Sequence, residues 1–143
     1  MRTQWRSRLG SIRATVFKAA SIERFKDAEC LHSRGRFEGA IYLCGYALEC
    51  RLKFSICAVR NRNHLEEREA KELGHELMRL LDATKLRDRL ASNDDLFVAL
   101  HSINTRWSTE IRYSGTAGTV RESERFLRDT RALCQWLEEV SRP

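Results

Sequence analysis

Apolar residues recur at helical spacing in separate segments of the chain, and this pattern predicts four helices. The first helix runs from about Ser11 to Ser33, before Gly35, a residue suited to the left-handed conformation that ends a helix. The second runs from Phe37 to about Arg60 and, as the most apolar segment, is expected to be the central helix. The last runs from Val120 to Val140. The first helix should bury a stripe of Ile12, Val16, Ala19, Ile22, Phe25 and Ala28, and the last one of Phe126, Leu133, Leu137 and Val140.

The third predicted helix is less regular than the others. It begins near Lys71 and continues or restarts after the run Ser-Asn-Asp-Asp at 92–95, which offers a helix N-cap. The charged stretch 61–70 before it predicts an exposed connection or a frayed helix end, and the stretch 114–119 predicts a flexible loop. The apolar positions of the third helix are Leu73, Leu77, Leu80, Leu81, Leu96, Leu100, Ile103 and Trp107.

Length and composition agree with a helical domain. A chain of 143 residues with one proline and seven glycines suits helices better than a turn-rich β fold. We expect a single all-α domain over residues 1–143, an antiparallel up-and-down four-helix bundle with or without a short extra helix. Residues 1–10 form a basic arm that is expected to be flexible. No apolar run approaches the ~20 residues of a membrane span, and no apolar core follows the basic start, so we expect a cytoplasmic protein.

Cysteine and histidine spacing gives little support for a metal, a cofactor or a reactive thiol. The five cysteines contain no CxxC pair, and three of them lie in the most apolar segment, so they are expected to be small buried residues in a reducing compartment. The four histidines form no HxxxH or HExxH motif, and there is no phosphate-binding loop of the GxGxxG or P-loop type. We therefore expect neither a metal nor a cofactor.

The polar residues of the second helix gather on one side of it. Projected at roughly 100° per residue, they fall within an arc of about 60°, with one further tyrosine beside it. The residues of this polar strip are Glu38, Tyr42, Tyr46, Glu49, Lys53 and Arg60. Glu49 and Lys53 are predicted to form an i,i+4 ion pair, with the acidic residue first, which is the favourable order. The strip is either the solvated side of an amphipathic helix or the lining of a polar cleft or dimer interface, and the two tyrosines favour the second interpretation.

Basic residues form a second pattern, on the last predicted helix. The formal net charge is +6, and 21 of the 26 basic residues are arginine, whose planar side chain pairs well with phosphates and carboxylates. Arg121, Arg125 and Arg128 recur at i, i+4 and i+7, with Arg131 at the edge. This arginine ridge is either a phosphate-binding surface or an ordinary solvated face, because acidic residues flank it.

Four motifs in order give the chain a resemblance to a known family. They are the run Gly-Arg-Phe-Glu-Gly-Ala-Ile-Tyr-Leu-Cys-Gly-Tyr-Ala-Leu-Glu-Cys-Arg-Leu-Lys at 35–53, Gly-His-Glu-Leu at 74–77, the pair Arg112-Tyr113, and the closing amphipathic helix at 122–139. Together these resemble the HEPN (higher eukaryotes and prokaryotes nucleotide-binding) domains over about residues 21–140. The resemblance implies an antiparallel bundle that usually dimerises and works in prokaryotic toxin–antitoxin, phage-defence or RNA-processing systems.

Many members of this family are metal-independent endoribonucleases, and here the chain departs from them. Their motif places an arginine and a histidine, about four to six residues apart, at the start of the last helix, but no histidine follows Arg112. Arg68 and His75 have this spacing at a different place, before the third helix. Because metal-free RNA cleavage needs a group that transfers protons, the missing histidine argues against cleavage and leaves phosphate binding intact.

The sequence thus predicts a cytoplasmic, dimeric HEPN-type protein that binds RNA or a nucleotide without cleaving it. A cognate nucleotidyltransferase or another defence-system protein is the expected partner, and no membrane is involved. One alternative is a metal-independent endoribonuclease toxin using Arg68 and His75; another is a non-catalytic dimerisation or interaction module. The residues expected to bind RNA or a nucleotide are Tyr42, Tyr46, Glu49, Lys53, Arg112 and Tyr113, with the arginine ridge as a further phosphate contact.

Overall fold

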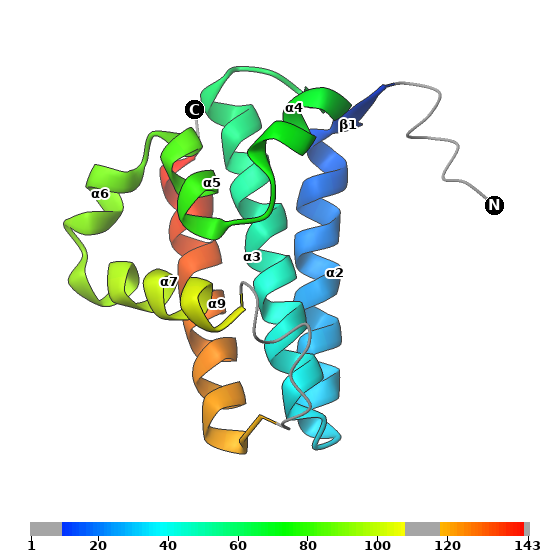
Figure 1. Cartoon of the computed structure of the whole chain (residues 1–143), viewed down its shortest axis with the longest axis vertical. Helices are drawn as coiled ribbons and strands as arrows, with labels where there is room; N and C mark the ends of the chain where they lie inside the picture. Colours follow the sequence, from blue (N-terminus) through cyan, green and yellow to red (C-terminus); the bar gives the residue numbers. More distant parts are fainter. Residues whose placement is uncertain (1–9, 108–117, 142–143) are drawn as a thin grey trace.

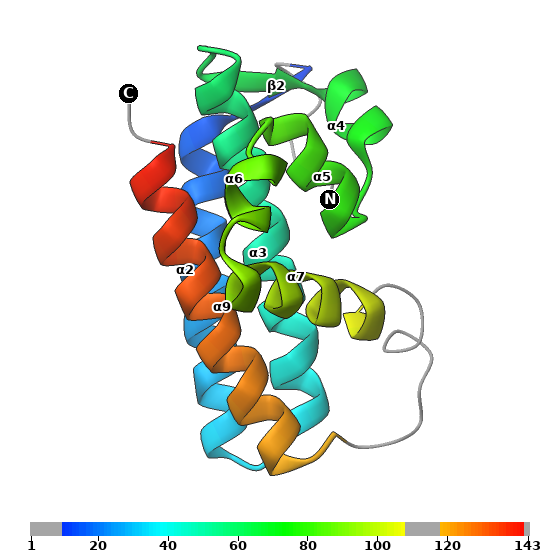
Figure 2. The same cartoon turned by 90° about the vertical axis from the view of Figure 1, so that its left-hand side faces the viewer.

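Three long helices run side by side along the molecule, and four short helices lie against one side of them (Figures 1 and 2). A computed structural model describes residues 10–107 and 118–141, and these contain seven helices and one two-stranded sheet. The long helices are α2 (Ala14–Ser33), α3 (Phe37–Val59) and α9 (Val120–Val140). Residues 1–9 of the predicted basic arm and 114–117 of the predicted loop lie outside the described residues.

The three long helices agree with the sequence prediction. Gly35, with φ of +74°, adopts the left-handed conformation expected between α2 and α3. The side chain of Thr119 caps α9 by accepting a hydrogen bond from the backbone N–H of Glu122 at 3.1 Å. α3 packs against α2 and α9 as well as against the short helices, so its predicted central place is confirmed.

The predicted stripe of α2 is confirmed at Ala28, which is fully buried, and is wrong at most of its other positions. Val16 and Ile22 are exposed at 41% and 44%, and Ile12 lies in a strand before the helix. The buried residues of α2 are Ala14, Phe17, Ser21 and Ala28. Small residues on this helix allow it to approach α3 closely, and the Ser21 hydroxyl is satisfied by donating to the Ala47 carbonyl oxygen at 2.8 Å. The buried positions of α2 are therefore those that contact the rest of the fold, and they differ from the stripe that the spacing predicts.

The third predicted helix is divided into short helices. These are α4 (Glu67–Leu73), α5 (Leu77–Thr84), α6 (Arg87–Ala91) and α7 (Asp94–Trp107). Gly74 with φ of +70° and Lys85 with φ of +61° end α4 and α5, because a left-handed residue cannot continue a helix. The backbone N–H of Leu96 donates to the Asn93 side chain at 3.2 Å, which confirms the predicted capping run before α7.

The stretch 61–70 is ordered secondary structure and not the exposed connection or frayed end expected from the sequence. β1 (Ser11–Arg13) pairs antiparallel with β2 (His64–Glu66), and Ile12 lies opposite Leu65, which is fully buried. Arg62, Glu66 and Glu69 of this stretch form ion pairs with one another, whereas Arg68 is 90% exposed, as the sequence suggested.

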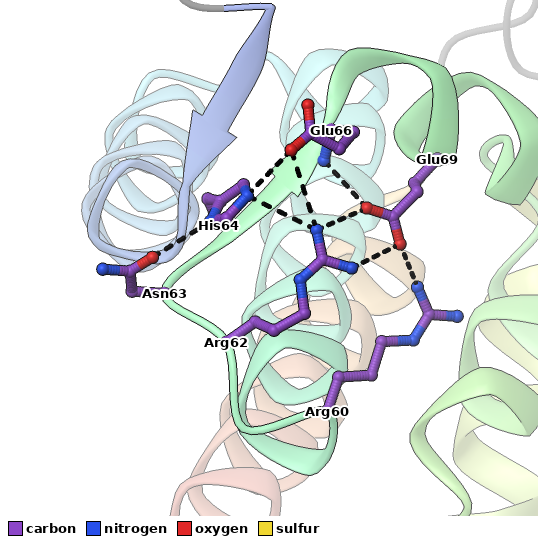
Figure 3. Close-up of polar contacts among 6 residues, drawn as sticks. All are labelled: Arg60, Arg62, Asn63, His64, Glu66 and Glu69. Atoms are coloured by element: carbon purple, nitrogen blue, oxygen red, sulfur yellow. Dashed lines mark hydrogen bonds and ion pairs between the residues drawn. The ribbon is translucent and has the colours of Figure 1, made fainter.

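Glu69 is the centre of this ion-pair cluster at one end of the bundle (Figure 3). Its two carboxylate oxygens accept hydrogen bonds from Arg62 at 2.6 and 2.8 Å, and one of them also accepts from Arg60 at 2.8 Å. The backbone N–H of Glu66 donates to the same carboxylate at 3.1 Å and completes a capping box at the start of α4. These contacts tie the end of α3 to β2 and α4, and the hydrogen bonds from Arg62 lower the pKa of Glu69 to about 2.

Candidate functional site

The polar strip of α3 faces the short helices over most of its length, whereas Arg60, just after the end of the helix, is exposed. At its first turn, Glu38 accepts a hydrogen bond from Arg106 of α7 at 2.8 Å, and Arg106 also donates to Glu122 of α9 at 2.9 Å. Glu49 and Lys53, further along, are both buried. The strip is therefore an internal polar interface between α3 and the layer of short helices, so the interpretation as a solvated side is wrong for these residues.

Aromatic rings fill the middle of this interface. Tyr42 and Tyr46 lie edge to face with ring centroids 5.2 Å apart, and Tyr46 lies edge to face with Trp107 of α7 at 5.7 Å. The indole N–H of Trp107 donates to the backbone carbonyl of Tyr42 at 2.9 Å. The close approach of α7 is possible because Gly45 has no side chain: a Cβ there would fall on the Trp107 ring.

A buried ion pair lies at the next turns of the strip and holds an exposed histidine. Lys53 donates to one carboxylate oxygen of Glu49, Oε2, at 2.8 Å, which confirms the predicted i,i+4 pair. The same oxygen lies 2.9 Å from Nδ1 of His75, in the short connection before α5. The side chains of Glu49 and Lys53 are only 5% and 8% exposed, whereas that of His75 is 58% exposed. The pair and the histidine form what we call the Glu49 triad.

The Glu49 triad fixes the orientation of the imidazole. Because an ionised carboxylate only accepts hydrogen bonds, Nδ1 of His75 must carry the proton that it shares with Glu49. In the neutral ring Nε2 is then the atom that can accept a proton or a hydrogen bond. The second oxygen of Glu49, Oε1, is buried without a hydrogen-bond partner. An exposed imidazole on a buried carboxylate is an arrangement suited to binding an anion or transferring a proton.

The structure joins some of the predicted site residues and separates others. His75 contacts Glu49, a pairing that no sequence pattern predicts because the two residues are 26 positions apart. Arg68 is 90% exposed on α4 and pairs with Glu72 at 3.4 Å, so no contact links it to His75 among the described residues. Arg112 and Tyr113 lie outside the described residues.

The arginine ridge on α9 is exposed, as predicted, but its surroundings are mixed in charge. Arg128 lies 3.5 Å from Asp129, and an open cavity of about 510 Å³ beside Arg125 and Arg128 is also lined by Asp94 and Asp95 of α7. Neighbouring carboxylates reduce the attraction of such a surface for phosphate. Arg121 lies in the first turn of α9 and does not line this cavity.

The cysteines agree only in part with the prediction that they are buried and unreactive. Burial raises the pKa of Cys44 to about 12 and the pKa values of Cys50 and Cys134 to about 11. Cys57 is also buried, but Cys30 is exposed on α2, which corrects the prediction at that position.

Two features are absent from the part of the chain that the structure describes, a cluster of metal ligands and a membrane-spanning helix. Within residues 10–107 and 118–141, no three His, Cys, Asp or Glu side chains are grouped so that they could hold a metal ion. None of the helices described is both long enough and apolar enough to cross a membrane. Comparison with protein-family models, with curated proteins and with solved structures finds no significant match to this chain.

Proposed function

We propose that this chain is a HEPN-type helical protein that binds RNA or a nucleotide without cleaving it. The observation that carries the proposal is the exposed imidazole of His75, held by buried Glu49 next to the tyrosines of the polar strip. In this interpretation the short helices α4–α7 take the place of the third helix of a four-helix bundle. The resemblance in sequence further suggests a cytoplasmic homodimer and a role in a prokaryotic defence, toxin–antitoxin or nucleotidyltransferase-linked system.

Charge explains why the Glu49 triad would attract phosphate. Lys53 already neutralises Glu49 in the interior, so protonation of His75 gives the triad a net positive charge at its exposed end. An imidazolium donates a charge-assisted hydrogen bond to a phosphate oxygen from Nε2. Arg112 would add a second phosphate contact, and an aromatic ring such as that of Tyr113 could stack on a base. The overall charge of +6 favours the approach of a polyanion.

Binding measurements on matched histidine variants test the proposal. Filter binding of single-stranded RNA and of ATP is measured at pH 6 and pH 8 with the wild type, His75→Gln, Arg112→Ala and His101→Gln. His101 is exposed on α7 and serves as the control. We expect His75→Gln and Arg112→Ala to weaken binding at least about tenfold, binding to be stronger at pH 6 and in low salt, and His101→Gln to behave as the wild type. No binding by the wild type at low salt, or equal binding by all four proteins, refutes the proposal.

A second candidate function, metal-independent RNA cleavage, is favoured by one observation. The contact between Nδ1 of His75 and Glu49 leaves Nε2 as a proton acceptor, as a general base requires. RNA is incubated with the purified protein in a chelator, and the products are separated on a gel. Cleavage that is lost in His75→Gln and kept in His101→Gln would replace binding without cleavage as the function. If Arg68→Ala then cleaves normally, the proposed Arg68 and His75 pairing is wrong while the role of His75 stands.

A further inference from the structure

Arg51 is a charged residue on the side of α3 that faces α2 and α9. It lies two residues from Glu49 and so points to nearly the opposite side of the helix. Only 6% of it is exposed, and within residues 10–107 and 118–141 its buried Nε has no hydrogen-bond partner. Among the described residues no carboxylate forms an ion pair with its guanidinium group, which lies 5.4 Å from the centre of the Phe54 ring.

A buried arginine in this state needs an acceptor. The guanidinium group has five N–H donors and stays charged, and burying such a group without a counter-charge costs several kcal/mol. The contact with an aromatic ring offsets only part of that cost. Water or an anion that accepts hydrogen bonds from this group would reduce that cost.

A cavity lies where this acceptor would have to be. It has a volume of about 240 Å³, is formed between α2, α3 and α9, and is lined by Arg51 itself. Apolar groups of Ile22 and Phe25 also line it, together with the thiol of Cys134. Burial raises the pKa of this thiol to about 11, so it carries no negative charge near neutral pH. The cavity thus combines apolar groups with one buried charged donor, Arg51, and further charged residues also line it.

The charges around the cavity leave a single positive charge to be matched. Arg131 is already paired with Glu29 at 2.8 Å across the gap between α2 and α9. The other charged lining residues are Lys26, Arg51 and Glu138, which sum to one positive charge. A monoanion would balance this charge, whereas a phosphate dianion would place excess negative charge near Glu29 and Glu138.

We propose that this cavity binds a small monoanionic carboxylate with an apolar body, such as an aromatic or branched-chain acid, through paired hydrogen bonds from Arg51. The planar guanidinium group matches a carboxylate in geometry. The volume is below the roughly 300–1,000 Å³ of cavities for drug-sized molecules, which restricts the ligand to a small acid. The site lies on a different face of α3 from the Glu49 triad, so it does not depend on the function proposed above.

Calorimetric titration with benzoate tests this site, with benzamide and inorganic phosphate as comparison ligands. The proteins are the wild type, Arg51→Met, which keeps an apolar stem, Arg51→Lys, which keeps the charge, and Arg79→Met as a control. Arg79 is exposed on α5 and does not line the cavity. We expect benzoate to bind the wild type and Arg79→Met alike, and to bind Arg51→Met at least about tenfold more weakly. Arg51→Lys should be intermediate, and benzamide and phosphate should bind the wild type more weakly than benzoate.

Thermal unfolding without ligand separates loss of the site from loss of the fold. Because Arg51 is buried without an acceptor among the described residues, Arg51→Met should unfold at the same temperature as the wild type or higher. Added benzoate should stabilise the wild type and Arg79→Met alike, and should stabilise Arg51→Met much less. The proposal is overturned if benzoate does not bind the wild type, if Arg51→Met binds it equally well, or if phosphate binds better than benzoate through Arg51. Unfolding of Arg51→Met at a much lower temperature would show that Arg51 is a structural residue and would also overturn it.

Discussion

Gly45 is the position at which a single methyl group should disturb this fold most. It lies on α3 where α7 crosses, and in Gly45→Ala the new Cβ would fall on the indole of Trp107. That ring is 1% exposed and its N–H is bonded to the carbonyl of Tyr42, so it has no free space into which it can move. The obstacle is a large buried ring and not the tip of a flexible side chain.

The expected loss of stability follows from the contacts of Trp107. Removing a buried tryptophan side chain costs roughly 3–5 kcal/mol, and its hydrogen bond adds about 1 kcal/mol. Alanine is favoured over glycine in a helix by about 1 kcal/mol, which offsets part of this. We therefore expect Gly45→Ala to lower the free energy of unfolding by about 3–5 kcal/mol, or the melting temperature by roughly 6–20 °C for a chain of this size.

Urea unfolding followed by far-UV circular dichroism measures this change, with Gly39→Ala as the control. At Gly39 a Cβ would meet only the end of the Leu31 side chain, at 3.1 Å, so that variant should change stability by less than about 1 kcal/mol. In a Trp107→Leu background, Gly45→Ala should lower the free energy of unfolding much less, because the ring that the new methyl group displaces is absent. A Gly45→Ala protein as stable as the wild type, or an equal cost in both backgrounds, would refute the steric argument.

Two further predictions concern acid and thiol reagents. The pKa of Glu69 is lowered to about 2 by Arg62, so its contribution is complete above the ordinary glutamate pKa and is lost as the pH falls from about 5 to 2. Since the Arg62–Glu69 pair is partly exposed, we expect the free energy of unfolding, measured in urea, to fall by about 1–2 kcal/mol over that range. The fall should be smaller in Glu69→Gln, and an equal pH dependence of the two proteins would contradict this. At pH 8 a thiol reagent should quickly modify one cysteine of the native chain, the exposed Cys30, and should modify the other four only on unfolding. Fast modification of a second thiol, or of no thiol, would contradict this prediction.

The sequence predicted those parts of the fold that are set by local chemistry. The bounds of α9 and the conformation of Gly35 follow from a long amphipathic pattern and from a residue type that favours one backbone region. The strand β2 (His64–Glu66) was missed because three residues show no periodicity and its partner strand is about 50 positions away. Ion pairing made 61–70 ordered, although its composition resembled that of an exposed connection.

The candidate site was harder to predict than the fold, for a physical reason. Glu49 and Lys53 were recognised as a pair because they are one helical turn apart. Their contact with His75 and the burial of the polar strip depend on how α5 and α7 pack against α3, and no local pattern encodes that packing. Arg51 gave no signal because one arginine in an apolar helix resembles a residue that extends to solvent.

Arg106 has a consequence for how the chain can change over evolution or by engineering. It pairs with Glu38 of α3 at 2.8 Å and with Glu122 of α9 at 2.9 Å, so that one guanidinium group joins three helices. A substitution that removes this group leaves two partly buried carboxylates without their shared counter-charge. Arg106 can therefore be replaced at little cost only if Glu38 and Glu122 are replaced with it, so these three positions are expected to change together.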